Sequence, residues 1–525
     1  MVGKVFRKSN MLLTPDQEMI RDAVRDFAKE QLWPHAAKWD KTHEFPKEAH
    51  KGLAALGAYG ICVPESLGGA NLDYLTLGLV LEEIAAGDGG VSTTISVTNC
   101  PVNAILMRYG NDAQKEKWLT RLAQGELLGA FCLTEPHVGS DASALRTTAT
   151  KKGDAYVING VKQFITSGKH GDVAIVIAVT DKGAGKKGMS AFIVPTTSPG
   201  YQVARLEDKL GQHSSDTAQI NFENCEVPAE NMIGQEGEGY KIALSALEGG
   251  RIGIAAQSIG MARSALEVAI EYAKQRESFG TAIFNHQAVG FRLAECATQL
   301  EAARQLMWHA ATLRDAGLPC LKEAAMAKLF ASETAEKVCS AAIQTLGGYG
   351  VVSDFPVERI YRDVKNLPRR ARVPNLRRHQ RRAKDHHSKG FGLTLPAPNA
   401  CPCGGAPTAF KRKGADAAYL DCCGRFIEQG QLPPDALHLM RSRYTAFALE
   451  HEAYLQHTWQ AAHRPESLDF DEGAKWLGLE IKDFVETGVQ EGQATAEVEF
   501  VARVRVTGKA HRLHERSRFV CEDGA

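Results

Sequence analysis

The chain has 525 residues, of which 44% are hydrophobic and 24% are charged, and its formal net charge is zero. This length exceeds one ordinary domain, and the composition is typical of a globular protein with more than one packed core. The balanced charge gives no indication of binding to nucleic acid or to a membrane surface. No run of about 18 apolar residues occurs, and the N-terminal segment lacks the apolar core of a secretory signal. We therefore expect a cytoplasmic location.

The first part of the chain has the pattern of helices. The segment from Thr14 to Gln17 has the form of a capping box with proline at the first helical position. Apolar residues then recur at helical spacing, and this pattern continues to about Gly129. We expect residues 1–129 to form a helical domain.

Residues 130–238 instead have the pattern of strands. The pair Asn159–Gly160 predicts a hairpin turn. Val173–Val179 is a continuous apolar run, and further strands are expected at Ser190–Val194 and Gln219–Phe222. The length of this region suits one β domain.

Helical pattern returns at residues 239–364 and is then replaced by a basic segment, residues 365–399. Arginines crowd the first part of this segment, where Asp385 is the only acid before Lys389. A solvated linker is the usual interpretation of such a run. A tether for an acidic partner is the alternative.

The last part of the chain, residues 400–525, has α+β character. Leu437, Met440, Tyr444 and Phe447 share one face of an expected helix, and alternation of apolar residues from Val498 to Val506 predicts a half-buried strand.

Four cysteines cluster at the start of this region: Cys401, Cys403, Cys422 and Cys423. Four thiolates in a short span are typical ligands of a tetrahedral zinc ion. Disulfide pairing is the alternative, and a reducing compartment disfavours it.

The segment FCLTEPHVGSDA, from Phe131 to Ala142, is the most informative stretch of the chain. It presents hydroxyls and backbone N–H groups with little side-chain bulk, which suits close approach to a ligand. An ordinary loop with a helix cap at Ser140 is the alternative interpretation.

Further strings in the same order strengthen the first interpretation: QFITSG from Gln163, LEGGRIGIAAQSIG from Leu247, YAKQRESFGTAIFNHQAV from Tyr272, AIQTLGGYG from Ala342, and VERIYRDV ending at Val364. Together they resemble the acyl-CoA dehydrogenase family. The resemblance implies a multidomain α+β fold with an α-helical domain, a β-barrel-like middle domain and a C-terminal helical bundle. It also implies bound FAD, a short- or medium-chain acyl-CoA substrate, an electron-transfer flavoprotein as partner, and a homotetramer or homodimer.

The resemblance assigns cofactor-binding positions along the chain. In the first half they are Phe131, Leu133, Thr134, Gly139, Ser140, Phe164, Ile165 and Thr166, with the hydroxyl of Thr166 near flavin N5. Phe164 stands where the family often has tryptophan. In the second half they are Arg276, Phe279 and Gln287, which reach the adenosine and pyrophosphate half across a subunit interface, and Gln344, Gly347 and Gly348. A helix C-cap explains the two glycines equally well. The implied substrate contacts are Ser140, Glu248, Gly249, Gly250 and Arg251.

The family's catalytic base has no counterpart in this sequence. Some members carry a glutamate at the position of Gly250, and others carry it in a downstream Tyr-Glu-Gly-Thr motif, which occurs nowhere in these 525 residues. We therefore assign no catalytic residue and expect impaired dehydrogenation, with a non-catalytic flavin or acyl-CoA binder as the alternative. Suitable codons for residues 365–388, read one nucleotide later, can spell the missing family segment. We hypothesise a frameshift at this point.

The C-terminal region resembles the YchJ family. The strings CPCG and CCGR match a SEC-C zinc motif, and PDALHLMRSRYTAF and HERSRF match the NTF2-like domain that accompanies it. This resemblance implies zinc bound at the cysteine cluster and assigns no reaction. A zinc-module interaction protein is the second functional alternative.

Overall fold

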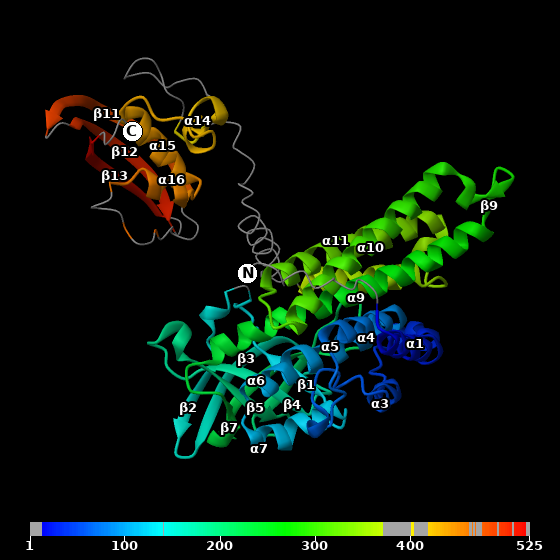
Figure 1. Ribbon diagram of the computed structural model, residues 1–525. Coiled ribbons are helices and arrows are strands. Elements are labelled where there is room, and N and C mark those ends of the chain that lie inside the picture. The colour runs from blue at the N-terminus through cyan, green and yellow to red at the C-terminus, as the bar shows by residue number, and fades with distance from the viewer. Residues whose placement is uncertain are drawn as a thin grey trace, which may run out of the picture. The chain divides into compact units, whose positions relative to one another are not determined.

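The computed structural model describes residues 13–139, 141–370, 401–403, 418–460, 465, 468, 475–490, 493–506 and 509–520. The chain divides into two compact units, Met1–Phe391 and Gly392–Ala525 (Figure 1). None of the helices in the described ranges combines the length and apolar character that a membrane span requires.

The first unit begins with a layer of helices joined by short π- and 3₁₀-helical turns. They are α1 (Pro15–Phe27), α2 (Trp33–Thr42), α3 (Lys47–Ala55), α4 (Tyr74–Gly87), α5 (Gly89–Val97), α6 (Ala104–Tyr109), α7 (Asp112–Gln114) and α8 (Thr120–Ala123). The predicted capping box is confirmed, since the Gln17 backbone N–H donates to Thr14 Oγ1 at 3.2 Å and Thr14 N–H donates to Gln17 Oε1 at 3.1 Å. These bonds satisfy backbone N–H groups that a helix start otherwise leaves without partners.

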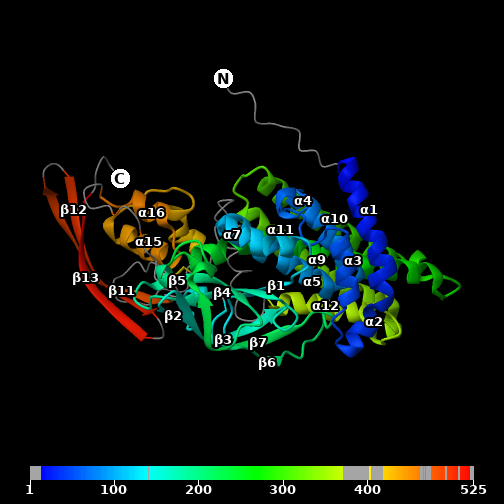
Figure 2. The same cartoon turned by 90° about the horizontal axis from the view of Figure 1, so that it is seen from below.

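A mixed eight-stranded sheet follows, with strand order β6-β7-β3-β2-β4-β5-β8 and β1 paired to β4. The strands are β1 (Gly129–Cys132), β2 (Thr148–Lys152), β3 (Ala155–Thr166), β4 (Val173–Val179), β5 (Met189–Pro195), β6 (Tyr201–Leu206), β7 (Thr217–Pro228) and β8 (Met232–Ile233). Figure 2 shows this sheet beside the helices of the unit.

The sequence of strand β4 is apolar throughout because both faces of the strand pack in a core. Val173, Ile175 and Ile177 pack in the core between the sheet and the helices, whereas Ala174 and Val176 belong to the core on the other face of the sheet. Both faces are therefore buried, and the alternation of a half-exposed strand is lost.

The predicted hairpin turn at Asn159–Gly160 is wrong. Both residues lie inside strand β3, where the register with β7 shifts between Ile158 and Gly160. Gly160 marks this irregularity because a Cβ there would lie 2.5 Å from Thr147 Oγ1. The turn that joins β2 to β3 contains Gly153, which has φ of 59°. A glycine inside a strand is typical of a β-bulge, and Gly160 follows this pattern rather than that of a hairpin turn.

Within residues 239–370, the second helical layer consists of α9 (Gly239–Gln275), α10 (Gln287–Asp315), α11 (Leu321–Leu346) and α12 (Val357–Arg370). Figure 1 shows α9, α10 and α11 running side by side. Short strands β9 (Glu277–Ser278) and β10 (Thr281–Ala282) form a hairpin between α9 and α10. Helix α9 also packs closely on α4, since a Cβ at Gly260 would lie 2.1 Å from the Glu82 carbonyl oxygen.

The second unit contains α14 (Gly424–Ile427), α15 (Ala436–Ala448), α16 (Glu452–His457) and a three-stranded antiparallel sheet in the order β11-β12-β13. The strands are β11 (Lys475–Gln490), β12 (Gln493–Val506) and β13 (Lys509–Val520), which Figure 2 shows next to α15 and α16. The predicted helix face is confirmed, because Met440 and Tyr444 are buried and Leu437 and Phe447 pack against the same core.

Candidate functional site

The segment after β1 is fixed by a tight turn and by strand β3. Glu135 and Val138 exchange two backbone hydrogen bonds of 3.0 Å, which closes the turn. The Gln163 backbone N–H donates to the Thr134 carbonyl at 2.8 Å, and Lys162 Nζ donates to the Leu133 carbonyl at 3.1 Å. The structure thus brings together two of the segments predicted to bind the cofactor. Ser140 lies outside the described residues.

A buried ion pair holds this turn in place. Lys162 Nζ lies 2.9 Å from Glu135 Oε1, and both side chains are at most 1% exposed. Glu135 also accepts the backbone N–H groups of Arg146 at 2.7 Å and Thr147 at 3.0 Å. Sequence reasoning missed this pair, although a lysine within a strand of alternating burial was a signal for it.

The electrostatics of the pair follow from burial and mutual attraction. Burial opposes ionisation of Glu135, but the Lys162 ammonium and the Arg146 N–H outweigh it and hold the pKa of this carboxyl below its usual value. Burial lowers the pKa of Lys162, and the attraction of Glu135 opposes that effect. We infer that both groups are charged, because each has its counter-ion and further hydrogen bonds.

Strand β3 ends in an irregular segment that carries three of the predicted cofactor contacts: Phe164, Ile165 and Thr166. Phe164 has φ of 59° and Ser167 has φ of 57°, a left-handed conformation that costs free energy in residues other than glycine. Ile165 and Thr166 are buried, whereas Phe164 is 40% exposed. The buried Ser167 Oγ has no hydrogen-bond partner in the described part of the chain. Strained backbone next to an unpaired buried hydroxyl is typical of a ligand site.

The predicted substrate contacts lie on α9. Gly249 is explained by packing, because a Cβ there would lie 2.8 Å from the Tyr74 hydroxyl. Gly250 is different, since a Cβ at this position would meet no protein atom within 4 Å. The glycine pair therefore leaves open space at Gly250, next to Arg251.

Glu248 is the acid in this sequence string, and its carboxylate is engaged. It accepts a hydrogen bond from Cys320 Sγ at 3.1 Å and lies 3.3 Å from Arg314 Nη1. Burial and the adjacent Glu248 carboxylate raise the pKa of the Cys320 thiol to about 12, so the thiol remains the donor. The guanidinium of Arg314 also lies 4.1 Å from the centre of the Tyr74 ring.

A buried lysine on α11 was not predicted. Lys328 is 7% exposed, and its Nζ has no hydrogen-bond partner among the described residues. Burial and the nearby positive charge of Arg251 lower the pKa of Lys328 to about 7. A lysine inside the apolar string AAMAKLF was the sequence signal for this group.

Other predicted cofactor contacts meet in a groove of about 560 Å³ at the C-terminal ends of α9 and α11. Arg276 at the end of α9 lines it together with Gly347 and Gly348, and Tyr272 and Tyr349 line it as well. Gly347 also caps α11, with φ of 61°, so the helix-end explanation of this glycine holds too. A Cβ at Gly347 or Gly348 would meet no atom within 4 Å, which leaves room for a ligand.

Three predicted cofactor contacts do not line this groove. Phe279 lies between β9 and β10 and is 99% exposed, while Gln287 begins α10 and Gln344 lies on α11, both exposed. A fully exposed phenyl ring is costly in water. Phe279 and Gln287 are expected to reach the cofactor of another subunit, and their exposure leaves both side chains accessible.

The cysteine cluster of the second unit has metal-site geometry. Cys401, Cys403, Cys422 and Cys423 are all buried, and Cys403 Sγ lies 3.5 Å from Cys401 Sγ, 3.6 Å from Cys422 Sγ and 3.5 Å from Cys423 Sγ. Zinc–sulfur bonds of about 2.3 Å in a tetrahedron place sulfurs about 3.8 Å apart. These separations suit a tetrahedral ion and exceed the roughly 2.05 Å of a disulfide.

Comparison with known proteins decides the family. Models of the N-terminal, middle and C-terminal domains of acyl-CoA dehydrogenases match residues 14–126, 130–225 and 237–368. An acyl-CoA dehydrogenase of Bacillus subtilis is 48% identical over 356 residues, which are 68% of this chain and 94% of that protein. The chain belongs to the acyl-CoA dehydrogenase family.

Two further relatives of this chain have names that specify short acyl chains. The short-chain specific acyl-CoA dehydrogenase of Rattus norvegicus mitochondria is 44% identical over 67% of this chain and 86% of its own length. The structure of butyryl-CoA dehydrogenase from Megasphaera elsdenii has a TM-score of 0.67 and 42% identity, covering 68% of this chain and 95% of the other. The predicted fold class is thereby confirmed.

Outside the acyl-CoA dehydrogenase part, a model of the YchJ middle NTF2-like domain matches residues 435–525. The match to the dehydrogenase C-terminal domain ends at residue 368, close to the end of α12 at Arg370. Helix α12 thus extends past the predicted end of helical pattern at Val364, because Lys365 pairs with Glu336 and Asn366 is buried. The remainder of the predicted basic linker, from residue 371, lies outside the described residues.

Proposed function

We propose that this protein binds FAD and short- or medium-chain acyl-CoA, and that it removes hydrogen from Cα and Cβ of the thioester slowly. The open space at Gly250, in a chain without the Tyr-Glu-Gly-Thr motif, carries the proposal. The site has the family's scaffold for cofactor and substrate, but neither of the family's two positions supplies a carboxylate base.

The residues around β1 and β3 suit an isoalloxazine ring. Phe131, Leu133 and Ile165 supply apolar contacts, and Thr166 supplies a hydroxyl for N5 of the ring. The unpaired Ser167 Oγ and the left-handed backbone beside it fit a site completed by a ligand. When bound, FAD supplies the two-electron acceptor for the hydride that leaves Cβ.

The groove at Arg276 suits the other half of the cofactor. A guanidinium offers a planar fork of donors for pyrophosphate, and Gly347 and Gly348 leave space for close approach. The exposed rings of Phe279 and of Phe291 on α10, 99% and 68% exposed, support a homo-oligomer in which another subunit covers them.

Proton removal is the step that this chain performs poorly. The Glu248 carboxylate is held by Cys320 and Arg314, so it is not available to the substrate Cα. Loss of a general base typically slows a reaction by roughly 10²–10⁴-fold. The bound thioester would therefore be positioned without a group to accept its proton.

Restoring a carboxylate at Gly250 tests the proposal. Because a Cβ at Gly250 meets no protein atom, Gly250→Glu is expected to fold and to raise the rate of butyryl-CoA oxidation by about 10²-fold or more. Gly250→Gln is the matched control, which has the same length and no base, and it is expected to leave the rate unchanged. Equal rates for Gly250→Glu, Gly250→Gln and the unmodified chain would contradict the proposal.

The short acyl chain and the electron acceptor are part of the same proposal. The similarity to short-chain and butyryl-CoA dehydrogenases supports a short substrate. An electron-transfer flavoprotein is the acceptor that membership of the family implies. Rates with butyryl-, octanoyl- and palmitoyl-CoA, measured on the Gly250→Glu variant, test the preference for chain length.

We further propose that the basic segment arose by a frameshift. The end of the family match at residue 368, next to this segment, supports the idea. The three dehydrogenase matches also support the proposed domain boundaries near residues 129 and 238. The nucleotide sequence across codons 355–405 tests it. An undisturbed reading frame with unrelated codons would eliminate the hypothesis.

For the second unit we propose a zinc site at the four cysteines. Four of the sulfur pairs are 3.5 to 4.0 Å apart and all four sulfurs lie within 4.8 Å of one another, which supports this assignment. The same observation favours the second candidate function, a zinc-module interaction protein whose dehydrogenase part binds ligands without turnover. Failure of Gly250→Glu to gain activity while FAD and zinc remain bound would favour that alternative.

A further inference from the structure

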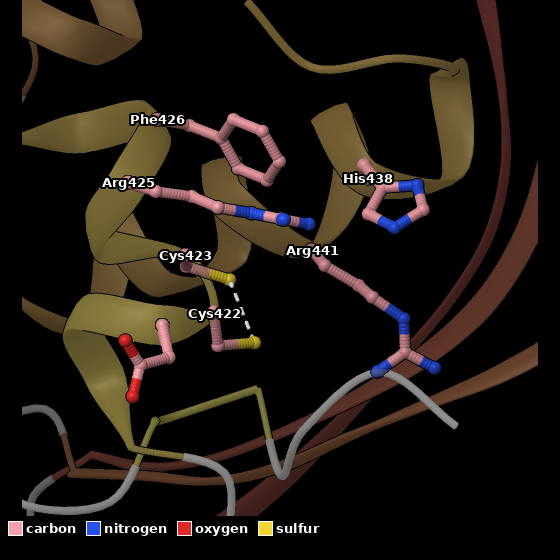
Figure 3. Close-up of a pocket in the computed structure, with 7 residues that line it drawn as sticks. Cys422, Cys423, Arg425, Phe426, His438 and Arg441 are labelled. Atoms are coloured by element: carbon pink, nitrogen blue, oxygen red, sulfur yellow. Dashed lines mark hydrogen bonds between the residues drawn. The ribbon is translucent and has the colours of Figure 1, made fainter. Parts of the chain in front are cut away.

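A small cavity lies beside the cysteine cluster of the second unit (Figure 3). It has a volume of about 200 Å³, and its lining residues come from α14, α15 and the segment before α14: Asp421, Cys422, Cys423, Arg425, Phe426, His438 and Arg441. Cys422 and Cys423 also belong to the cysteine cluster, whereas the proposed dehydrogenase and zinc sites assign no role to the other lining residues.

The cavity is rich in hydrogen-bond donors. Arg425 and Arg441 bring two guanidinium groups to it from different helices, while Asp421 is the only acid among the described residues that line it. His438 lies across the cavity from Arg425 in Figure 3, with Nδ1 hydrogen-bonded to Asp435 Oδ1 at 2.8 Å. Apart from the two cysteines, the charged side chains of the wall are therefore two guanidinium groups and one carboxylate.

Arg425 is held in place and incompletely satisfied. Its guanidinium lies 4.6 Å from the centre of the Phe426 ring, which restricts its plane. Its Nε is buried and makes no hydrogen bond within the described residues. A buried donor without an acceptor costs free energy, and an anion in the cavity would remove that cost.

We infer that this cavity binds a small tetrahedral oxyanion, the phosphate of inorganic phosphate or of a phosphomonoester. Guanidinium groups present forks of N–H donors that match phosphate oxygens, and two such groups from α14 and α15 enclose the anion from different directions. The volume of about 200 Å³ fits a single phosphate group and is below the usual size of a site for a drug-sized ligand.

A competing explanation is that the two arginines only balance a metal centre. A zinc ion with four thiolates carries a net charge of about −2, which nearby cations stabilise. The unpaired Nε of Arg425 argues against this as the full explanation, because it donates to no cysteine sulfur. The two explanations predict different effects of substitution on phosphate binding and on zinc content.

Calorimetric titration of the zinc-loaded full-length protein separates them, with inorganic phosphate, phenyl phosphate and acetate as three probes. We expect one equivalent of phosphate to bind, and Arg425→Gln or Arg441→Gln to weaken its binding by about tenfold or more. Arg505→Gln, which removes an exposed charge from β12, is the control and should leave binding unchanged. Tighter binding of phenyl phosphate would identify a phosphomonoester, and tighter binding of inorganic phosphate would identify the free ion.

Zinc content is measured by mass spectrometry on every variant. This measurement distinguishes a variant that only weakens phosphate binding from one that loses the metal. Arg425→Lys retains the charge but not the fork of donors, so it should keep zinc and still weaken phosphate binding. The inference is overturned by a zinc-loaded protein that binds neither phosphate probe, by binding of acetate alone, or by phosphate binding that both glutamine variants leave unchanged.

Discussion

The buried pair of Lys162 and Glu135 allows a quantitative test of how the cofactor segment is positioned. Lys162→Met removes the counter-ion at 2.9 Å from a carboxylate that is 1% exposed, and it removes the donor to the Leu133 carbonyl. The carboxylate keeps only its bonds from the Arg146 and Thr147 N–H groups. Breaking a buried pair in this way typically costs about 3–5 kcal/mol of unfolding free energy. We expect a loss of this size, together with weaker FAD binding.

The double variant Lys162→Met/Glu135→Gln provides the control. The amide oxygen of glutamine still accepts from the backbone but carries no charge, so most of the lost stability should return. Guanidinium denaturation followed by tryptophan fluorescence measures stability, and flavin titration measures affinity. A single variant that loses less than about 1 kcal/mol, or a double variant less stable than the single, would refute the reasoning.

Three other variants test separate parts of the account. Lys328→Met should stabilise the protein most below pH 7 and progressively less towards pH 10.5, because the lowered pKa of about 7 makes the unfolded state bind more protons between these values; denaturation at pH 6, 8 and 10 measures this, and a pH-independent difference would contradict it. Phe279→Ala should weaken FAD binding and subunit association, as measured by flavin titration and light scattering, whereas unchanged values would remove this ring from the interface. Cys422→Ser should lower bound zinc below one equivalent per chain by metal analysis, and full zinc retention would exclude this cysteine as a ligand.

Local rules predicted those parts of the fold that local contacts determine. The capping box at Thr14 depends on residues three positions apart, and the buried strand Val173–Val179 depends on its own composition. The prediction of a hairpin turn at Asn159–Gly160 was wrong because the same dipeptide occurs both in hairpin turns and in β-bulges. The choice depended on Thr147, which lies beside Gly160 only in the folded sheet.

The candidate site likewise combines features that the sequence predicts with features that depend on tertiary packing. Strings that resemble those of the family identified the segments from Phe131 and Gln163, and the structure joins these segments through the hydrogen bond from Gln163 N–H to the Thr134 carbonyl. The left-handed conformations of Phe164 and Ser167 and the unpaired amine of Lys328 depend on tertiary packing. The apolar string around Lys328 indicates that the lysine is buried, but it does not indicate that the amine lacks a partner, and the sequence around Phe164 and Ser167 does not indicate backbone strain.

The most direct test of the central claim is the response of the FAD-loaded protein to butyryl-CoA. Purified protein, supplied with FAD and freed of excess, should show flavin absorbance, and anaerobic butyryl-CoA should bleach it about 10²–10⁴-fold more slowly than it bleaches the Gly250→Glu variant. A preparation that takes up no flavin, or one that bleaches as fast as this variant, would contradict the account.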